Sequence, residues 1–167
     1  DNRLRISEEK YRSIFENAIE GIFQTTPEGR VITANSTFAS MYGYDSPQEM
    51  INSIGDIGKE FYVNPKDRER FKSICEKQGS VEGFEEQVYR KDRKKAWVSI
   101  NARAVRDENG KTLYYEGTIE DITQRKEIED ALRSSEERYR TIIENIQDGY
   151  YEVDLDGNYT FFNEGLL

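Results

Sequence analysis

The stretch "YRSIFENAIEGIFQTTPEGRVITANSTFASMYGY", residues 11–44, contains the pattern that decides the fold. The helical spacing of its first apolar residues stops at Gly21. Two short runs, "GIFQTT" and "RVITAN", flank the turn residues Pro27 to Gly29, which predicts a hairpin of two strands. The segment "STFASMYGY" then predicts a short helix that ends near Gly43.

The opening of this pattern occurs twice in the chain. "SEEKYRSIFENAIEG" at residues 7–21 and "SEERYRTIIENIQDG" at residues 135–149 align without gaps, and Asn35 then matches Asn163. A repeat of this period is a whole domain rather than a solenoid unit. We therefore expect one full copy and the beginning of a second, and a first residue of Asp1 suggests a piece of a longer protein.

The middle of the first copy changes from helices to strands. "NPKDRERFKSICEKQG", residues 64–79, predicts a helix with Asn64 as its N-cap and Gly79 at its end. Three strands are expected to follow, at residues 84–91, 96–106 and 112–121. Because strands and helices are segregated along the chain, the predicted fold class is α+β with an antiparallel sheet.

A charged helix is expected after the last strand, with a stripe that recurs in steps of four and three residues and is apolar except at Ser135. The stripe consists of Ile128, Leu132, Tyr139, Ile142 and Ile146. A heptad stripe is typical of a dimerising coiled coil, although a helix that packs on a domain carries a stripe too. The predicted segments are an N-terminal amphipathic helix at 1–21, a domain at 22–123, a linker helix at 124–147 and a truncated second copy at 148–167.

Composition excludes several classes of function. The chain has 167 residues, a net charge of -9 and no histidine. The negative charge argues against binding nucleic acid or an anionic membrane, because both attract cationic proteins. The lack of histidine removes the Ser-His-Asp triad, histidine-ligated haem and most zinc sites, so no metal site is expected. The single cysteine, Cys75, permits no internal disulfide.

No sequence feature points to catalysis, secretion or a membrane span. Glu85 and Glu86 are adjacent, so on a strand they point to opposite faces and cannot act as an acid–base pair. No apolar run approaches the roughly 20 residues of a membrane helix, and no signal peptide is visible. We therefore expect a cytoplasmic chain that is not itself an enzyme.

Four segments resemble the sensor-box form of the PAS domain. They are the stretch quoted first and the segments "PKDRERF", "RKDRKKAWVSINARAVRDENG" and "EGTIEDITQRK". The resemblance covers residues 7–126 and restarts at residue 135. It implies a five-stranded antiparallel sheet with helices on one face, followed here by a long linker helix and a partial second copy. It also implies sensing or scaffolding inside signalling proteins.

In this family, the sheet face that meets the helices can line a ligand pocket. The resemblance places ten residues at this pocket: Phe38, Tyr42, Glu86, Val88, Arg90, Val98, Ile100, Ala102, Tyr115 and Ile119. The alternative is that they form an ordinary packed core. Glu86 and Arg90 are charged residues on this face, so they pair with each other, pair with a neighbour or hold a polar ligand. The resemblance also makes Asp121 and Thr123 the tether between the last strand and the outgoing helix, a place where both residue types act as caps as well.

The sequence does not identify a cofactor. Histidine-ligated haem is excluded, and covalent flavin is disfavoured because related light sensors need a cysteine where residues 35–38 read Asn-Ser-Thr-Phe. Noncovalent flavin is disfavoured too, since residues 79–84 lack the tryptophan of the redox members. One departure from the family is Arg93, which stands where glycine usually follows "RKD", and it leaves the turn type open.

The resemblance implies a relay module. A change caused by a small molecule or a partner would pass through the outgoing helix to an output domain of the same polypeptide, which we expect to be a histidine kinase. The alternatives are a diguanylate cyclase or chemoreceptor, or a ligand-free dimerisation scaffold. A homodimer without nucleic-acid or membrane contact is expected. We also expect the aromatic hairpin at residues 149–163 to pack on the first domain or on a neighbouring chain.

Overall fold

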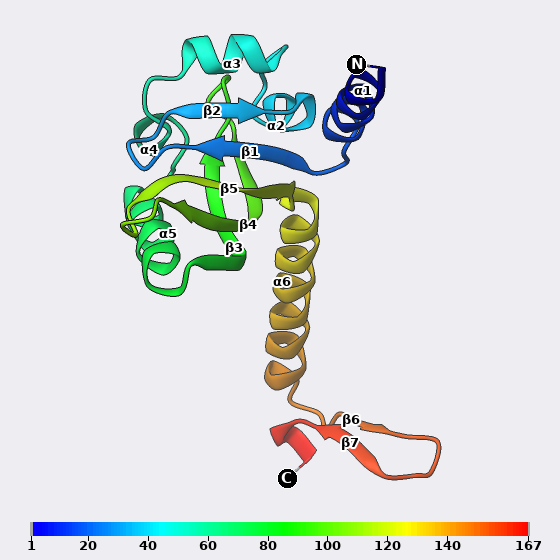
Figure 1. Cartoon of the computed structure of the whole chain (residues 1–167). Helices are drawn as coiled ribbons and strands as arrows, with labels where there is room; N and C mark the ends of the chain where they lie inside the picture. The colour runs from blue at the N-terminus through cyan, green and yellow to red at the C-terminus, as the bar shows by residue number, and fades with distance from the viewer. Residues whose placement is uncertain (1, 167) are drawn as a thin grey trace. The chain divides into compact units, whose positions relative to one another are not determined.

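The computed structural model describes residues 2–166 and divides into two compact units, residues 1–123 and 124–167. Figure 1 shows the elements in chain order. The first part of the chain contains α1 (Asn2–Glu16), β1 (Gly21–Thr25), β2 (Val31–Ala34), α2 (Ser36–Met41), α3 (Pro47–Ser53), α4 (Ile57–Glu60), α5 (Pro65–Gln78), β3 (Ser80–Tyr89), β4 (Lys95–Arg106) and β5 (Thr112–Asp121). The remainder contains α6 (Thr123–Asn145), β6 (Tyr151–Val153), β7 (Tyr159–Phe162) and the short 3-10 helix η1 (Glu164–Leu166).

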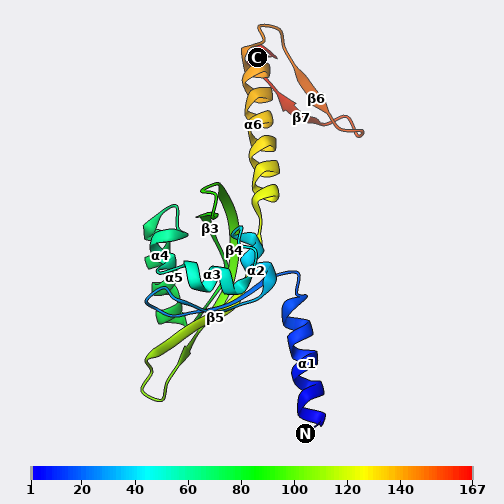
Figure 2. The ribbon, with the colours of Figure 1, turned by 90° about the horizontal axis from the view of Figure 1, so that it is seen from above.

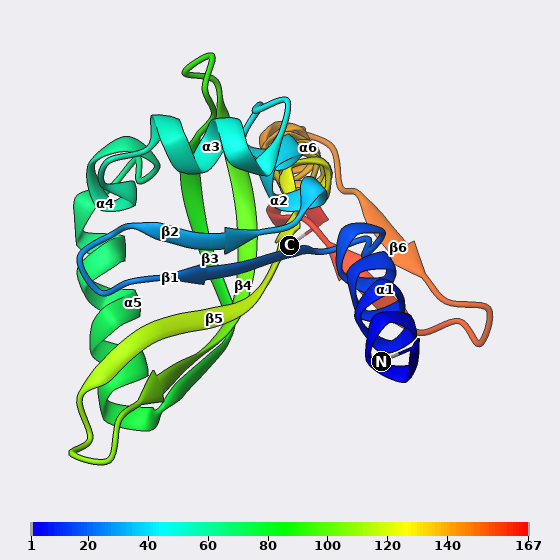
Figure 3. The ribbon, with the colours of Figure 1, turned by 45° about the horizontal axis from the view of Figure 1, so that its top comes forward.

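Five strands of the first unit form one antiparallel sheet in the order β2-β1-β5-β4-β3. The first strand therefore lies inside the sheet, between β2 and the last strand β5 (Figure 3). Helices α2 to α5 lie against one face. The predicted α+β fold, with a five-stranded antiparallel sheet, helices on one face and a long helix after it, is confirmed.

The core lies between the sheet and these helices. Along β4, Val98, Ile100 and Ala102 are buried, whereas Trp97 and Ser99 on the other face are only half-buried. This period of two is what a sheet buried on one face requires. Each large apolar side chain that is removed from water contributes about 1.5–3 kcal/mol to the free energy of folding, so this alternation holds the helices on one face.

Helix ends follow the local sequence in one case and depart from it in another. In α5, the Asn64 side chain accepts a hydrogen bond from the Lys66 amide, and Gly79 ends the helix with a positive φ of 83°, as predicted. The N-terminal helix α1, by contrast, ends at Glu16 rather than at Gly21, which is the first residue of β1. The expectation that α1 runs as far as Gly21 was wrong, because the chain leaves the helix before the strand begins.

Two backbone positions constrain the sheet. Arg93, in the turn between β3 and β4, is the one non-glycine residue with a positive φ (67°) among residues 2–166. This conformation costs an ordinary residue about 1–2 kcal/mol. Gly117 in β5 lies so close to β4 that an added Cβ atom would stand 1.9 Å from the Asn101 carbonyl oxygen and 2.7 Å from the Cα atom of Ala102. Only glycine permits this close pairing of strands.

The second unit consists of α6 and a short hairpin (Figure 2). Strands β6 and β7 pair in antiparallel fashion, with Tyr151 opposite Phe162. Gly157 in their turn has a positive φ of 86°, as a tight hairpin turn demands. The hairpin is where the repeat predicts it. Its packing on the first domain or on a neighbouring chain stays a prediction.

Candidate functional site

A small cavity of about 30 Å³ lies between the sheet and the helices of the first unit. Five of the ten residues predicted for a pocket line it: Phe38, Tyr42, Glu86, Ile100 and Ile119. Four others are buried in the surrounding core without lining the cavity: Val88, Val98, Ala102 and Tyr115. The cavity and the packed core are therefore parts of one region, and the cavity takes up only a small fraction of it.

Arg90 lies outside the cavity, contrary to the prediction. Strand β3 ends at Tyr89, so the alternation of faces that placed Arg90 inward no longer applies. Its guanidinium group instead forms an ion pair with the Asp121 carboxylate at 2.5 Å, and about a third of its side chain is exposed. Of the three possibilities for Arg90, the structure selects pairing with a neighbour.

Glu86 is the unusual group of the cavity. Its side chain is 2% exposed, and its Oε2 atom has no hydrogen-bond partner among the described residues. The pKa of Glu86 is raised to about 8, mainly by burial and also by the nearby Asp67 carboxylate, while Arg68 and a hydrogen bond to Tyr62 oppose the shift. A charged carboxylate that is buried away from water is costly, so Glu86 is uncharged over much of the range below about pH 8.

Arg68, which is not among the residues predicted from the sequence, forms another wall of the cavity. Its guanidinium group donates to the Thr26 carbonyl oxygen at 3.2 Å and lies 5.7 Å from the centres of the Phe71 and Tyr115 rings. These contacts fasten α5 to the turn between β1 and β2. A signal for it existed in the sequence, since Arg68, Phe71 and Cys75 fall on one face of the helix and all are buried.

The end of β5 and the start of α6 meet in a hydrogen-bonded joint. Asp121 Oδ1 accepts hydrogen bonds from the Thr123 hydroxyl at 2.6 Å and from the Thr123 amide at 3.0 Å. Thr123 Oγ1 accepts in turn from the Trp97 amide of β4 at 3.0 Å. Asp121 Oδ2 holds Arg90. The two residues implied as a tether thus fix the first residue of α6 to the two neighbouring strands.

A short route of contacts leads from the cavity to this joint. The Tyr42 carbonyl oxygen, on a residue that lines the cavity, accepts a hydrogen bond from the Lys91 amide at 2.8 Å. Lys91 also pairs with the Glu49 carboxylate of α3. Its neighbour along the chain, Arg90, holds Asp121. The turn at residues 90–91 therefore contacts both the cavity wall and the outgoing joint.

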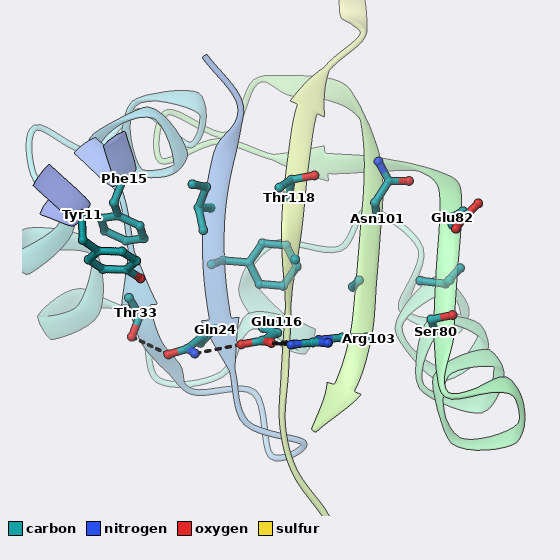
Figure 4. A pocket seen from close by; sticks show the side chains of 15 residues that line it. Tyr11, Phe15, Gln24, Thr33, Ser80, Glu82, Asn101, Arg103, Glu116 and Thr118 are labelled. Carbon is teal, nitrogen blue, oxygen red and sulfur yellow. Dashed lines mark hydrogen bonds and ion pairs between the residues drawn. The ribbon is translucent and has the colours of Figure 1, made fainter. Parts of the chain in front are cut away.

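A larger and more open groove, of about 460 Å³, lies on the opposite face of the sheet (Figure 4). A row of polar side chains crosses its floor: the Thr33 hydroxyl donates to Gln24 at 2.8 Å, and the Gln24 amide donates to Glu116 at 3.0 Å. The same carboxylate accepts from Arg103 at 2.6 Å, and these bonds lower the pKa of Glu116. The groove is larger, but the unsatisfied polar group lies in the inner cavity, which is therefore the stronger candidate for ligand binding.

The predicted apolar stripe is exposed in the second unit, and four of its members lie in α6, whereas Ile146 follows the end of the helix at Asn145, short of the predicted residue 147. The exposed fractions of Ile128, Leu132 and Ile142 lie between 54% and 61%, and those of Tyr139 and Ile146 are 48% and 37%. The Tyr139 hydroxyl is hydrogen-bonded to Tyr150 and Glu152, each at 2.8 Å, at the edge of the hairpin. A stripe of this size is available for contact with another helix.

Comparison with known proteins identifies the fold family. A family model described as a PAS domain matches residues 19–124, and a second PAS model matches residues 137–167. The chain belongs to the PAS domain family. The resemblance seen in the sequence is thereby confirmed, including the beginning of a second PAS copy.

Curated relatives of this PAS chain are signalling kinases and sensors. Sporulation kinase C of Bacillus subtilis is 27% identical over 135 residues, which cover 80% of this chain and 30% of the kinase. The sensor protein FixL of Bradyrhizobium diazoefficiens is 29% identical over 104 residues, which cover 60% of this chain and 21% of that protein. The chain thus spans less than a third of the length of these relatives. It is a PAS sensory module of signal transduction.

Solved PAS structures share the fold. A PAS domain from Colwellia psychrerythraea has a TM-score of 0.57 at 25% identity and covers 71% of this chain and 98% of its own. A sensory box histidine kinase/response regulator from Burkholderia thailandensis has a TM-score of 0.59 at 25% identity, covering 79% and 98%. Within the part of the PAS chain that the structure describes, no helix is both long and apolar enough to span a membrane.

Proposed function

We propose that this PAS module is the sensing and relay part of a cytoplasmic sensor histidine kinase, and that it catalyses no reaction itself. The kinase output is supported by the relatives, which include sporulation kinases C and E of Bacillus subtilis. The relay is supported by one structural observation, the route of contacts from the cavity to the first residue of α6.

Each step of the route joins groups that are hydrogen-bonded, ion-paired or adjacent in the chain. A change in the cavity that shifts Tyr42 pulls on Lys91 through its amide hydrogen bond. Arg90, the adjacent residue, then shifts its ion pair with Asp121. Because Asp121 also holds the amide and hydroxyl groups of Thr123, the first turn of α6 responds. Hydrogen bonds to a charged group are about twice as strong as neutral ones, so the bonds that the Asp121 carboxylate makes to Arg90 and Thr123 are the strongest of the route.

Hydrogen exchange tests the relay. Above about pH 8, where Glu86 is ionised, Glu86→Gln removes a buried charge from the cavity, and the readout is the exchange rate of the amides at residues 124–128 in the first turn of α6. We expect Glu86→Gln to change these rates in the wild-type background and to have no effect once Arg90→Ala has removed the ion pair. Glu82→Gln, an exposed change on the same strand, is the matched control. Equal effects of Glu86→Gln with and without Arg90 would contradict the proposed route.

The unsatisfied carboxyl group supports a small polar ligand in the cavity. A water molecule needs about 10–15 Å³ of such volume, so a cavity of about 30 Å³ admits a ligand of only a few heavy atoms. A ligand that binds the folded state raises its melting temperature by mass action. Small polar compounds that bind here are expected to stabilise the wild type and Glu82→Gln but not Glu86→Gln. Equal shifts in all three proteins would favour the ligand-free scaffold.

The exposed stripe of α6 supports a homodimer. Replacing Leu132 and Ile142 with aspartate forces two charges toward an apolar contact and is expected to weaken self-association. The matched control places aspartate at Ser134 and Thr141, which lie on the same helix outside the stripe and are also exposed. Analytical ultracentrifugation measures the outcome. A wild-type chain that stays monomeric at tens of micromolar, roughly where weak dimers form, would contradict the proposal.

A further inference from the structure

Two buried asparagines hold the same place in the two PAS copies. Asn35 has no exposed surface, and its side-chain amide donates to the carbonyl oxygens of Phe15 at 2.9 Å and Glu20 at 3.1 Å. Its Oδ1 atom accepts from the amide of Ile22 in β1 at 2.9 Å, and from the amide of Phe38 in α2 at 2.9 Å. One side chain therefore joins the end of α1 to the first strand of the sheet.

Asn163 repeats this arrangement in the second unit. It is 3% exposed, and its amide donates to the carbonyl oxygens of Ile143 at 2.8 Å and Asp148 at 3.2 Å. Its Oδ1 atom accepts from the amide of Tyr150 at 2.7 Å. The partners lie 20, 15 and 13 residues before the asparagine, the same three separations as at Asn35. Two copies that differ at most positions have kept one bonding pattern.

The chemistry of this contact requires an amide. The last carbonyl groups of a helix have no partner inside the helix, so they need donors from elsewhere. Asparagine offers two N–H donors and one acceptor oxygen, whereas aspartate, when ionised, only accepts. Each donor or acceptor of a buried amide that has no partner lowers the stability of the fold by about 1–3 kcal/mol, which makes an incomplete set of bonds unfavourable. Asparagine thus holds the helix end by donating and the strand by accepting.

The helix α6 is fastened at its other end as well. Its first residue, Thr123, belongs to the joint with Asp121 and Trp97 in the first unit. Its last turn supplies the Ile143 carbonyl group to Asn163 in the second unit. Between these two points lie 20 residues of helix (143 minus 123), about 30 Å at 1.5 Å per residue.

We propose that Asn35 and Asn163 are positioning residues of the relay: each fixes the helix that enters a PAS copy to the first strand of that copy. The outgoing helix of the first copy is then the incoming helix of the second. A displacement at the Thr123 joint reaches β6 through Asn163. This inference extends the proposed relay, but the asparagine contact is testable apart from it.

Spin-label distances test the contact within each unit. One label pair is placed on Arg138 of α6 and Asp156 of the hairpin turn, and a second pair on Lys10 of α1 and Glu120 of β5, at exposed positions. The native Cys75 does not compete for the reagent, because it is buried and burial raises the pKa of its thiol to about 11. We expect a single narrow distance for each pair in the unmodified protein.

Four variants separate positioning from general stability. Asn163→Ala is expected to broaden the 138–156 distance, and Asn35→Ala the 10–120 distance. The amide of Tyr150 or Ile22 should then exchange about tenfold faster, as expected for the loss of one ordinary hydrogen bond. The aspartate variants keep the acceptor oxygen but lose the N–H donors. They should therefore keep the slow exchange of these amides while still broadening the label distances. Asn101→Ala, which removes a bond to the Gly83 amide in the same sheet, is the control.

The outcomes distinguish the alternatives. Alanine variants that melt at lower temperature but keep narrow distances would show a merely structural role and overturn the proposal. So would aspartate variants with distances as narrow as those of asparagine. If Glu86→Gln alters amides at 124–128 but never the Tyr150 amide, the relay holds and this extension of it fails. If Glu86→Gln alters neither, the relay fails, and the label distances still decide the role of the asparagines.

Discussion

Replacing Glu86 with glutamine should remove a large part of the pH dependence of folding. The pKa of Glu86 is about 8 in the folded state, against 4.5 for an unperturbed glutamate. Above about pH 4.5 the unfolded chain therefore loses this proton while the folded chain keeps it. Stability falls as the pH rises, and the loss is complete only above the folded pKa. At about 1.4 kcal/mol per pH unit, the free energy of unfolding should drop by roughly 2–3 kcal/mol between about pH 5.5 and about pH 7.5.

Urea denaturation at both pH values measures the effect. Fluorescence of Trp97, the single tryptophan, reports on the first unit because this residue lies in β4. Glutamine has nearly the same shape and cannot ionise, so Glu86→Gln should be more stable than the wild type at the higher pH and lose this advantage at the lower one. The exposed change Glu82→Gln should leave the wild-type pH dependence intact. Parallel pH profiles for the wild type and Glu86→Gln would refute the reasoning.

Three further predictions follow from the backbone and from the buried thiol. Arg93→Gly should raise the free energy of unfolding by up to about 1 kcal/mol, because glycine adopts the positive φ without strain, and a fall in stability would show that the contact of Arg93 with the Tyr89 ring outweighs the strain. Gly117→Ala should destabilise the sheet by several kcal/mol, at least the roughly 1–3 kcal/mol of an overpacked core, and an unchanged melting temperature would contradict the close approach to Asn101. Cys75 should react with alkylating reagents only as the first unit unfolds, which mass spectrometry along a urea series would check. Labelling at the same rate in the native state would contradict its burial.

The sequence predicted regular elements well because their signals are local. Alternation along β4 separates buried Val98 and Ile100 from half-buried Trp97, as the residue pattern indicates. Helices α3 and α4, of seven and four residues, were not predicted, because neither is long enough for a helical period to show, whereas the short α2 was predicted from Gly43 near its end rather than from a period. The strand β3 begins at Ser80 rather than at residue 84. Its pairing with β4 shifts register between Val81 and Phe84, where Gly83 has a positive φ, so the first residues do not continue the alternation seen from Phe84 onward.

The candidate site was harder to predict, because its geometry depends on contacts that are distant in sequence. The inward face of Glu86 followed from strand alternation, but no local pattern shows that its Oε2 atom lacks a partner or that Arg68 donates to the Thr26 carbonyl oxygen. Arg90 was misplaced because alternation stops where a strand stops. The role of Asn35 could not be read from its own neighbours, since three of its four partners lie 13 to 20 residues earlier in the chain and only the Phe38 amide is close in sequence.

The order of strands also sets when the PAS sheet can form during synthesis. Strand β1 pairs with β5, with Gly21 opposite Ile119, so about 98 residues (119 minus 21) must be made before one edge of the first strand is covered. Until then, a nascent chain presents a two-stranded hairpin with an unpaired edge, which is only marginally stable and invites pairing with other strands. Contacts so distant in sequence are slow to close.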